Sequence, residues 1–465
     1  SPLERNWVLY DVGNSAFTLL VSTLLPIYFN YIAGNAGISS VDYLAYWGYA
    51  ASIVTIIVAF MGPVVGTMTD IKDFRKPIFA VSIAIGTIGC IAMGFAKQWI
   101  LFLAIYMIAK IGYSCSLIFY DSMLSDVTTN SRMDMVSAQG FAWGYIGSCV
   151  PFAGCLVIVL FADKIGISLE TAMILSFIII AVWWGFMSIP LIKTYKQKHY
   201  ILKSRNAVSD SFSRIGKTFA NIKKQKKIMF FIIAFFFYID GVYTIIDMAT
   251  AYGSALGLNS TTLLLALLVT QIIAFPCAII FGRLSEKIET SKLILVCIAA
   301  YFGIAVFAVF LRNQIQFWIL AMLVGMFQGG IQALSRSFFT KIIPQNQSGE
   351  YFGILDICGK GASFVGTTVV GAASQITGNI IGKLGIKLLA GASKEGTIDI
   401  VHKCRGRNNI YDRLIKSMLN NGYNGGKVVI SHCFNEESAD YVAGQLRQQF
   451  PTVNIKIIPT GGLCS

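Results

Sequence analysis

Two carboxylates lie inside a long apolar stretch in the second half of the chain, where a charge is costly. Asp240 falls near the middle of residues 228–250, and Asp247 follows on nearly the same face of a helix. A carboxyl group that leaves water holds a proton more readily than a hydrated one. We therefore expect Asp240 and Asp247 to contact a solute or to carry protons. Alternatively, Asp240 caps a helix break at Gly241 or bonds a neighbouring helix.

Polar residues interrupt three other apolar stretches. Lys110 lies near the middle of residues 98–120 and needs either an acid or a polar cavity. Polar residues recur every four residues at Gln328, Gln332 and Arg336 and so form one stripe along a helix. A helix that faces lipid could not tolerate such a polar stripe. We expect the two glutamines to face a cavity and Arg336, nearer the helix end, to act at a gate.

Asp356 and Lys360 have the spacing of an ion pair within one helix. Residues four apart lie on the same face, so their charges can neutralise each other. We therefore expect a structural role for this pair.

These residues are positioned by eleven apolar stretches long enough to cross a bilayer. A helix rises about 1.5 Å per residue, so about 20 apolar residues span roughly 30 Å of hydrocarbon. The chain is 55% hydrophobic and 13% charged over 465 residues, which is typical of a membrane protein. We therefore predict an all-α polytopic membrane protein with spans at residues 7–31, 46–69, 77–96, 98–120, 136–160, 171–192, 228–250, 261–281, 293–311, 315–338 and 351–376.

The basic residues lie mostly in alternate loops, which predicts an orientation. With a cytoplasmic N-terminus, the cytoplasmic segments hold 21 lysines and arginines, and the opposite segments hold three. This asymmetry follows the positive-inside rule and accounts for the net charge of +14 without nucleic-acid binding. The boundaries define a six-helix bundle at 1–192, a basic cytoplasmic linker at 193–227, a five-helix bundle at 228–378 and a soluble tail at 379–465.

Two helices at corresponding places in the bundles end alike. Gly66 precedes Asp70 by four residues, and Gly282 precedes Glu286 by four. A glycine lets two helix ends approach closely, and an acid there can pair with a basic residue or a helix dipole. We expect Gly66, Asp70 and Glu286 to act at a gate.

The segment that contains Gly66 and Asp70 resembles the signature loop of the major facilitator superfamily. The loop also carries the basic pair Arg75 and Lys76, and Phe74 stands where that loop commonly has glycine. The resemblance implies gating roles for Arg75 and Lys76. It also implies two bundles of six helices, so that eleven spans leave the twelfth missing.

Four further motifs, in register over residues 5–378, resemble the vacuole-effluxer branch, the autophagy-related permeases. That branch implies export of a small solute such as an amino acid. The superfamily places its first and fourth helices around a central cavity, so Asp11 and Asn14 join the candidate site. Lys110 then pairs with Asp11 or binds the carboxylate of a solute. The motifs are Tyr10-Asp11-Val-Gly-Asn14-Ser15-Ala16-Phe17, Gly140-Phe-Ala-Trp-Gly144-Tyr145-Ile-Gly147, Tyr238-Ile-Asp240-Gly241-Val-Tyr-Thr244-Ile245 and Gln328-Gly-Gly-Ile-Gln332-Ala-Leu-Ser335-Arg336-Ser337.

The tail has the pattern of an α/β lobe. Residues 397–402, 427–431 and 453–458 read as strands, and residues 410–419 and 438–450 have helical spacing. Ala392-Ser-Lys-Glu-Gly396-Thr and Ser431-His432-Cys-Phe-Asn435 are similar to the C-terminal lobe of DegV fatty-acid-binding proteins. That similarity implies a lipid-carboxylate contact at His432, but the lobe is incomplete and the family's N-terminal lobe is missing.

These observations favour a secondary transporter that moves a small solute by alternating access and is coupled to protons through its buried acids, and they do not indicate an enzyme. The ten cysteines lack metal-like spacing with the histidines, and no nucleotide-binding signature is present, so we expect no metal, cofactor or ATP-driven pumping. We expect a monomer in a bacterial plasma membrane, in contact with lipids. The alternatives are a membrane-anchored fatty-acid-binding protein that uses the tail, or a composite of two genes whose tail is non-functional.

Overall fold

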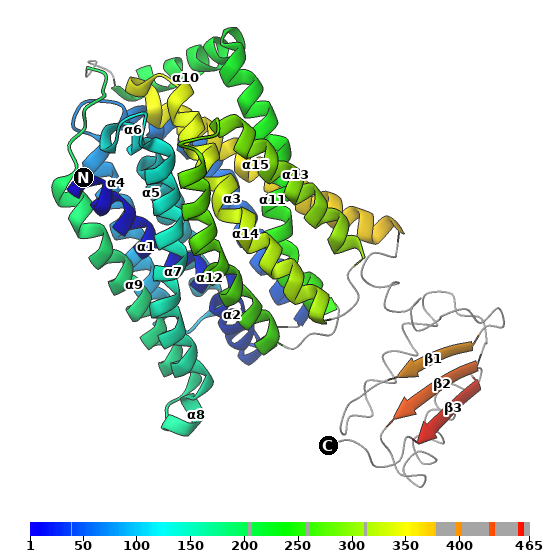
Figure 1. The fold of residues 1–465 in the computed structure, drawn as a ribbon. Helices are drawn as coiled ribbons and strands as arrows, with labels where there is room; N and C mark the ends of the chain where they lie inside the picture. Colours follow the sequence, from blue (N-terminus) through cyan, green and yellow to red (C-terminus); the bar gives the residue numbers. More distant parts are fainter. Residues whose placement is uncertain are drawn as a thin grey trace. The chain divides into compact units, whose positions relative to one another are not determined.

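The computed structural model describes residues 1–38, 40–202, 207–255, 260–310, 314–377, 397–401, 427–432 and 454–459. The chain forms two compact units, Ser1–Thr368 and Val369–Ser465. The first unit is a helical bundle, and the second contains a small parallel sheet (Figure 1).

The N-terminal half of the bundle contains six membrane-spanning elements. The first predicted span is broken at Thr23 into α1 and α2, and α6 and α8 are short helices between longer ones. The helices of this half are α1 (Pro2–Ser22), α2 (Leu24–Asn35), α3 (Ser40–Thr69), α4 (Arg75–Met93), α5 (Trp99–Ser122), α6 (Leu124–Val127), α7 (Met133–Leu160), α8 (Ala162–Ile165) and α9 (Leu169–Thr194).

The C-terminal half follows a linker that contains the amphipathic helix α10. Its helices are α10 (Ala207–Lys224), α11 (Lys226–Ala255), α12 (Ser260–Leu284), α13 (Thr290–Val309), α14 (Gln314–Ile342), the single turn η1 (Gln345–Gln347) and α15 (Ser348–Thr377). Within the described residues, ten elements are long and apolar enough to cross a membrane, and they match the first ten predicted spans. The eleventh predicted span forms α15. The prediction of an all-α polytopic membrane protein is therefore confirmed.

Glycines allow close packing between the helices that carry the polar residues. A Cβ added at Gly144 of α7 would lie 2.8 Å from Ser15 Oγ, and one added at Gly147 would lie 2.5 Å from Val12 Cγ1 on α1. A Cβ at Gly329 of α14 would lie 2.7 Å from the Cβ of Ala278 on α12. These contacts fix α1 against α7 and α12 against α14.

The two ends of the bundle differ. The helices α6 and α10 lie at one end, which we call the α6/α10 end, and α8 lies at the other (Figure 1). The first residues of α1 are fixed at the α6/α10 end, because Glu4 Oε2 accepts from Arg132 Nη2 at 2.9 Å and Glu4 also completes a capping box with Ser1.

Beyond the end of α15, the described part of the second unit is a three-stranded parallel sheet of order β1-β2-β3. Its strands are β1 (Thr397–Val401), β2 (Lys427–His432) and β3 (Asn454–Pro459), which confirms the three predicted strands. Thr397 pairs with Lys427, and Lys427 pairs with Asn454. The predicted helices at 410–419 and 438–450 lie outside the described residues. His432 is the last residue of β2, and its side chain also lies outside them.

Candidate functional site

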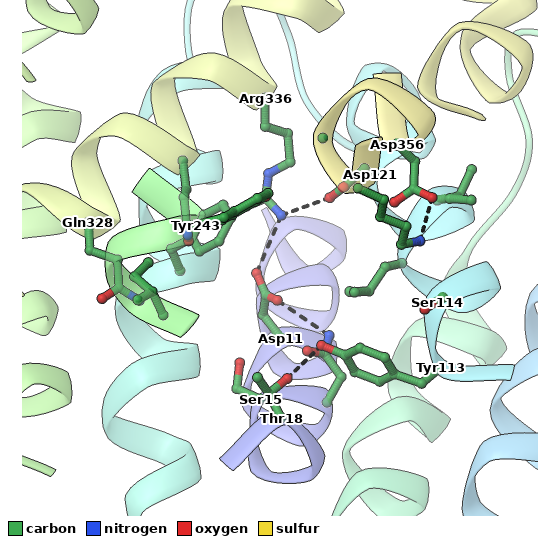
Figure 2. A pocket seen from close by; sticks show the side chains of 18 of the residues that line it. Asp11, Ser15, Thr18, Tyr113, Ser114, Asp121, Tyr243, Gln328, Arg336 and Asp356 are labelled. Atoms are coloured by element: carbon green, nitrogen blue, oxygen red, sulfur yellow. Dashed lines mark hydrogen bonds and ion pairs between the residues drawn. The ribbon is translucent and has the colours of Figure 1, made fainter. Parts of the chain in front are cut away.

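A cavity of about 470 Å³ lies among helices of both halves of the bundle. The helices α1, α5 and α7 line it from the N-terminal half, and α11, α12, α14 and α15 line it from the C-terminal half. Figure 2 shows polar side chains from several of these helices converging on it. Among the described residues, its charged lining comprises Asp11, Asp121, Asp356, Lys110, Arg336 and Lys360.

Arg336 on α14 joins the two halves at the cavity (Figure 2). Its Nη1 lies 2.9 Å from Asp121 Oδ1 on α5 and 3.5 Å from Asp11 Oδ2 on α1. Its Nε and Nη2 donate to the Oγ and the carbonyl oxygen of Ser137 on α7, each at 2.9 Å. One guanidinium group therefore faces two carboxylates and contacts three helices of the other half.

The surroundings of Arg336 are aromatic and tightly packed. Its guanidinium carbon lies 4.7 Å from the ring centroid of Trp7 and 4.2 Å from that of Phe141. A Cβ at Gly140 would lie 2.7 Å from Asp11 Oδ2 and 3.0 Å from Arg336 Nη2, so the ion pair needs a glycine there. Asp11 also accepts from the hydroxyl of Tyr120 at 2.9 Å. Cation–π contacts and hydrogen bonds thus hold this charged group in a fixed geometry.

Two lysines bring further charge to the cavity. Lys360 and Asp356 form an ion pair on α15, which confirms the pairing predicted from their spacing, and both residues line the cavity. The Nζ of Lys110 lies 4.6 Å from the ring centroid of Tyr113. The sequence left Lys110 with either Asp11 or a solute carboxylate as its partner. In the structure Asp11 pairs with Arg336, because α14 brings its guanidinium group between α1 and α5.

The structure brings some of the other predicted site residues to the cavity and not others. Gln328 and Gln332 line it together with Asn14 and Arg336, and Gln332 Oε1 accepts from the hydroxyl of Tyr145 at 2.9 Å. Asp240 is not among the lining residues. It accepts from Thr244 Oγ1 at 3.4 Å within α11, and this helix lines the cavity through Phe235, Tyr243 and Ile246. The side chain of Asp247 lies outside the described residues.

The halves also meet at the α6/α10 end through a contact between α3 and α15. A Cβ at Gly66 would lie 2.3 Å from the carbonyl oxygen of Gly349, and one at Gly353 would lie 2.6 Å from that of Gly62. Asp70 accepts from the backbone N–H groups of Gly349 at 2.8 Å and Glu350 at 2.9 Å. An acid from one half thus caps the N-terminus of a helix in the other half.

Arg75 adds ion pairs and a hydrogen bond to the α3–α15 contact. This buried guanidinium group lies 2.6 Å from Asp70 Oδ1 and 3.0 Å from Asp126 Oδ2, and it donates to Ser348 Oγ on α15 at 3.0 Å. Burial raises the pKa of Asp70 to about 6, because lost hydration outweighs the attraction of Arg75 and the two backbone N–H groups. His199 in the linker contributes as well, since its Nδ1 lies 2.7 Å from Asp126 Oδ1.

A second contact joins α7 and α12 at the same end. A Cβ at Gly282 would lie 2.7 Å from the Cβ of Ala138, so this glycine plays the part in α12 that Gly66 plays in α3. The acid at this contact is Asp134, which lies 2.6 Å from Lys341 Nζ and accepts from Thr290 Oγ1 at 2.7 Å. The repeat led us to expect Glu286 in this position, but Glu286 is exposed.

Lys76, the remaining predicted gate residue, is half-buried at the start of α4. The sequence reading missed Asp121, Asp126 and Asp134. All three lie at or just beyond the end of a span, where an acid reads as a loop residue. A signal was nevertheless available, since all three acids lie in the one short segment 121–135, whose remaining charged residue is Arg132.

The two halves, the charged cavity between them and the closure at one end define a polytopic membrane transporter. The chain is similar to several solved transporters of the major facilitator superfamily. It has a TM-score of 0.60 with FucP in the outward conformation, at 15% identity, covering 82% of this chain and 94% of that one. It has a TM-score of 0.59 with the human organic anion transporter MFSD10, at 14% identity, covering 82% of this chain and 96% of that one. The predicted major facilitator fold is thereby confirmed.

The family follows from the sequence comparisons. The model described as "Vacuole effluxer Atg22 like" matches residues 4–384, and the chain belongs to this family. The uncharacterized MFS-type transporter YxiO of Bacillus subtilis is 41% identical over 85% of this chain and 96% of its own length. The autophagy-related protein 22 of Eremothecium gossypii is 22% identical over 82% of this chain and 87% of its own.

The tail has separate relatives. The model described as "Uncharacterised protein, DegV family" matches residues 370–465. A DegV domain-containing protein of Streptococcus pneumoniae is 36% identical over 20% of this chain. The chain spans about a third of the length of that relative, 34%. The lipid contact at His432 stays a prediction.

Proposed function

We propose that this transporter moves a small zwitterionic solute, such as an amino acid, and couples its movement to protons. The observation that supports this substrate class is the balanced charge of the cavity, with three carboxylates and three cations among its described lining residues. A solute with both a carboxylate and an ammonium group finds partners of opposite charge there. A solute of one charge would instead add an uncompensated charge to a lining whose own charges balance.

Proton coupling is supported by the unequal pairing at Arg336. This residue faces both Asp11 and Asp121, so one positive charge is shared by two negative charges. Two carboxylates at one buried site favour the uptake of a proton by one of them. Protonation of Asp11 or Asp121 would weaken the ion pairs that join Arg336 on α14 to the N-terminal half. Binding of a proton would in this way be linked to the movement of the two halves.

The transport cycle we propose is alternating access about the cavity. The α3–α15 and α7–α12 contacts close the α6/α10 end, and opening requires both to separate. The excess of basic residues in the loops supports a cytoplasmic location for this end and for the N-terminus. We further propose that the transporter acts as a monomer in the plasma membrane, with Lys76 and Glu286 contributing to the gate from its periphery.

The test is uptake of radiolabelled amino acids into proteoliposomes, with and without a pH gradient. We expect gradient-driven accumulation by the wild type and its loss in Asp121→Asn, because an amide keeps the size but cannot cycle a proton. Counterflow exchange, which needs no net proton movement, should survive in this variant. Equal accumulation with and without the gradient would refute coupling, and no uptake of any amino acid would refute the substrate class.

The variant Asp240→Asn is the matched comparison for Asp121→Asn. The sequence favoured Asp240 as the coupling residue, and that role stays open because this residue lies on the same helix as cavity-lining residues without lining the described cavity itself. Asp240→Asn should preserve gradient-driven uptake if Asp11 and Asp121 carry the proton. If Asp240→Asn abolishes it while Asp121→Asn does not, the coupling site is on α11.

A further inference from the structure

An apolar side pocket of about 60 Å³ lies between α11, α12 and α14. It shares Ile246, Gln271 and Gln328 with the lining of the main cavity, so the two spaces adjoin at these residues. Beyond them the walls are aliphatic or aromatic. They are formed mainly by Ala266, Leu267, Phe317, Leu320, Ala321 and Val324.

The polar group in the wall of this side pocket already has partners. Thr270 Oγ1 donates to the carbonyl oxygen of Ala266 at 2.9 Å and lies 3.2 Å from that of Ala321 on the facing helix. Its one donor hydrogen is therefore used within α12 or between α12 and α14. Among the described residues that line the pocket, the amide side chains are those of Gln271 and Gln328, at its junction with the main cavity.

The pocket is held open by its own backbone. A Cβ at Gly325 would lie 2.7 Å from the carbonyl oxygen of Thr270, so α12 and α14 are already as close as their main chains allow. Small side chains at Ala266 and Ala321 then leave space that larger residues would fill. The pocket therefore does not depend on a movement of the two helices to form.

We propose that the apolar side pocket binds a compact aliphatic substituent of the transported solute, while the charged groups of the solute bind in the main cavity. This inference rests on the proposed function. A single water needs roughly 10–15 Å³ of such volume, so the pocket of about 60 Å³ accommodates about four to six heavy atoms. A branched chain of three or four carbons matches this size, whereas a benzyl group exceeds it.

The proposal divides recognition between two environments. Gln271 and Gln328 lie at the junction of the main cavity and the side pocket. In the proposed complex they are beside the bond that joins the charged part of the solute to its aliphatic side chain. Each methylene that leaves water for the side pocket strengthens binding by about 4-fold. The solute series glycine, alanine, valine and leucine should therefore bind with rising affinity, and phenylalanine should bind more weakly than leucine.

The test measures affinities of the purified full-length protein for these five amino acids by calorimetry, with counterflow in proteoliposomes as a second measurement. Ala321→Leu fills the side pocket and should reduce leucine affinity at least 10-fold while leaving glycine affinity within 2-fold. Leu320→Ala enlarges it and should shift the preference toward phenylalanine. Met322→Leu is the control, because Met322 follows Ala321 on α14 and is 38% exposed.

The outcomes distinguish failure of the side-pocket proposal from failure of the proposed transport function. Unchanged selectivity in both Ala321→Leu and Leu320→Ala, with normal wild-type binding, overturns the side pocket and leaves the proposed function intact. Equal loss for glycine and leucine in Ala321→Leu also overturns it, because a pocket that binds only the side chain of the solute cannot affect glycine. Absence of binding and counterflow for all five amino acids in the wild type refutes the proposed function and this inference with it.

Discussion

Gly66→Ala should shift the transporter away from the state that is closed at the α6/α10 end. The new Cβ would lie 2.3 Å from the carbonyl oxygen of Gly349, whereas ordinary contact begins at 3.4 Å, so α3 and α15 must separate by about 1 Å. The bonds from the N–H groups of Gly349 and Glu350 to Asp70, now 2.8 and 2.9 Å, would then be lost.

The size of the shift follows from these contacts. Overpacking costs about 1–3 kcal/mol, and each hydrogen bond to a charged group contributes about 1.5–3 kcal/mol. Partial relaxation offsets some of this, so we expect about 3 kcal/mol against closure. That energy corresponds to a change of roughly 100-fold in the ratio of closed to open molecules. Alanine otherwise favours a helix over glycine by about 1 kcal/mol, so the helix itself should not be weakened.

The assay is the distance between spin labels on Lys72→Cys and Asn346→Cys, two exposed positions beside the α3–α15 contact, after the ten native cysteines are replaced. We expect a longer distance population to dominate in Gly66→Ala. Gly154→Ala is the matched control, because no atom lies within 4 Å of its added Cβ. Identical distributions in Gly66→Ala and in the unsubstituted background would refute the reasoning.

Three further outcomes are expected. Closure of the α6/α10 end should depend on pH through Asp70. The pKa of Asp70 is raised from an ordinary 3.8 to about 6 in the closed state, so protonated Asp70 favours closure. This stabilisation of the closed state is full below about pH 4 and is lost as the pH rises through 6. The same spin labels would report this, and Asp70→Asn should remove that pH dependence. Gly140→Ala should abolish uptake by separating Asp11 from Arg336 while the melting temperature falls by only a few degrees; normal uptake would contradict a need for that ion pair. Truncation after Asn379 should leave the melting temperature in detergent unchanged, and a clear fall would show that the tail supports the bundle.

The spans could be predicted from the sequence because their signal is local. Each is a continuous apolar run whose length alone decides whether it can cross a bilayer. The strands of the tail were likewise visible in short apolar runs. The break at Thr23 was not predicted, since α1 and α2 continue the same apolar run and only the local backbone distinguishes them.

The site could be predicted only in part, because its pairings join distant helices. Gln328, Gln332 and Arg336 reveal their common face through their spacing. Whether Asp11 meets Lys110 or Arg336 depends on how α1, α5 and α14 pack, and no spacing in the sequence reports that. The role of Asp240 stays a prediction for the same reason, because an acid within a span shows that a partner is needed without showing which side of the helix faces the cavity.

The most direct measurement of the central claim is proton movement during solute movement. A pH-sensitive dye trapped in proteoliposomes reports the internal pH when an amino acid gradient is imposed across the membrane. We expect the wild type to move protons with the amino acid and Asp121→Asn to move the amino acid by exchange without a pH change. A wild type that transports the amino acid while the internal pH stays constant would contradict proton coupling through Asp11, Arg336 and Asp121.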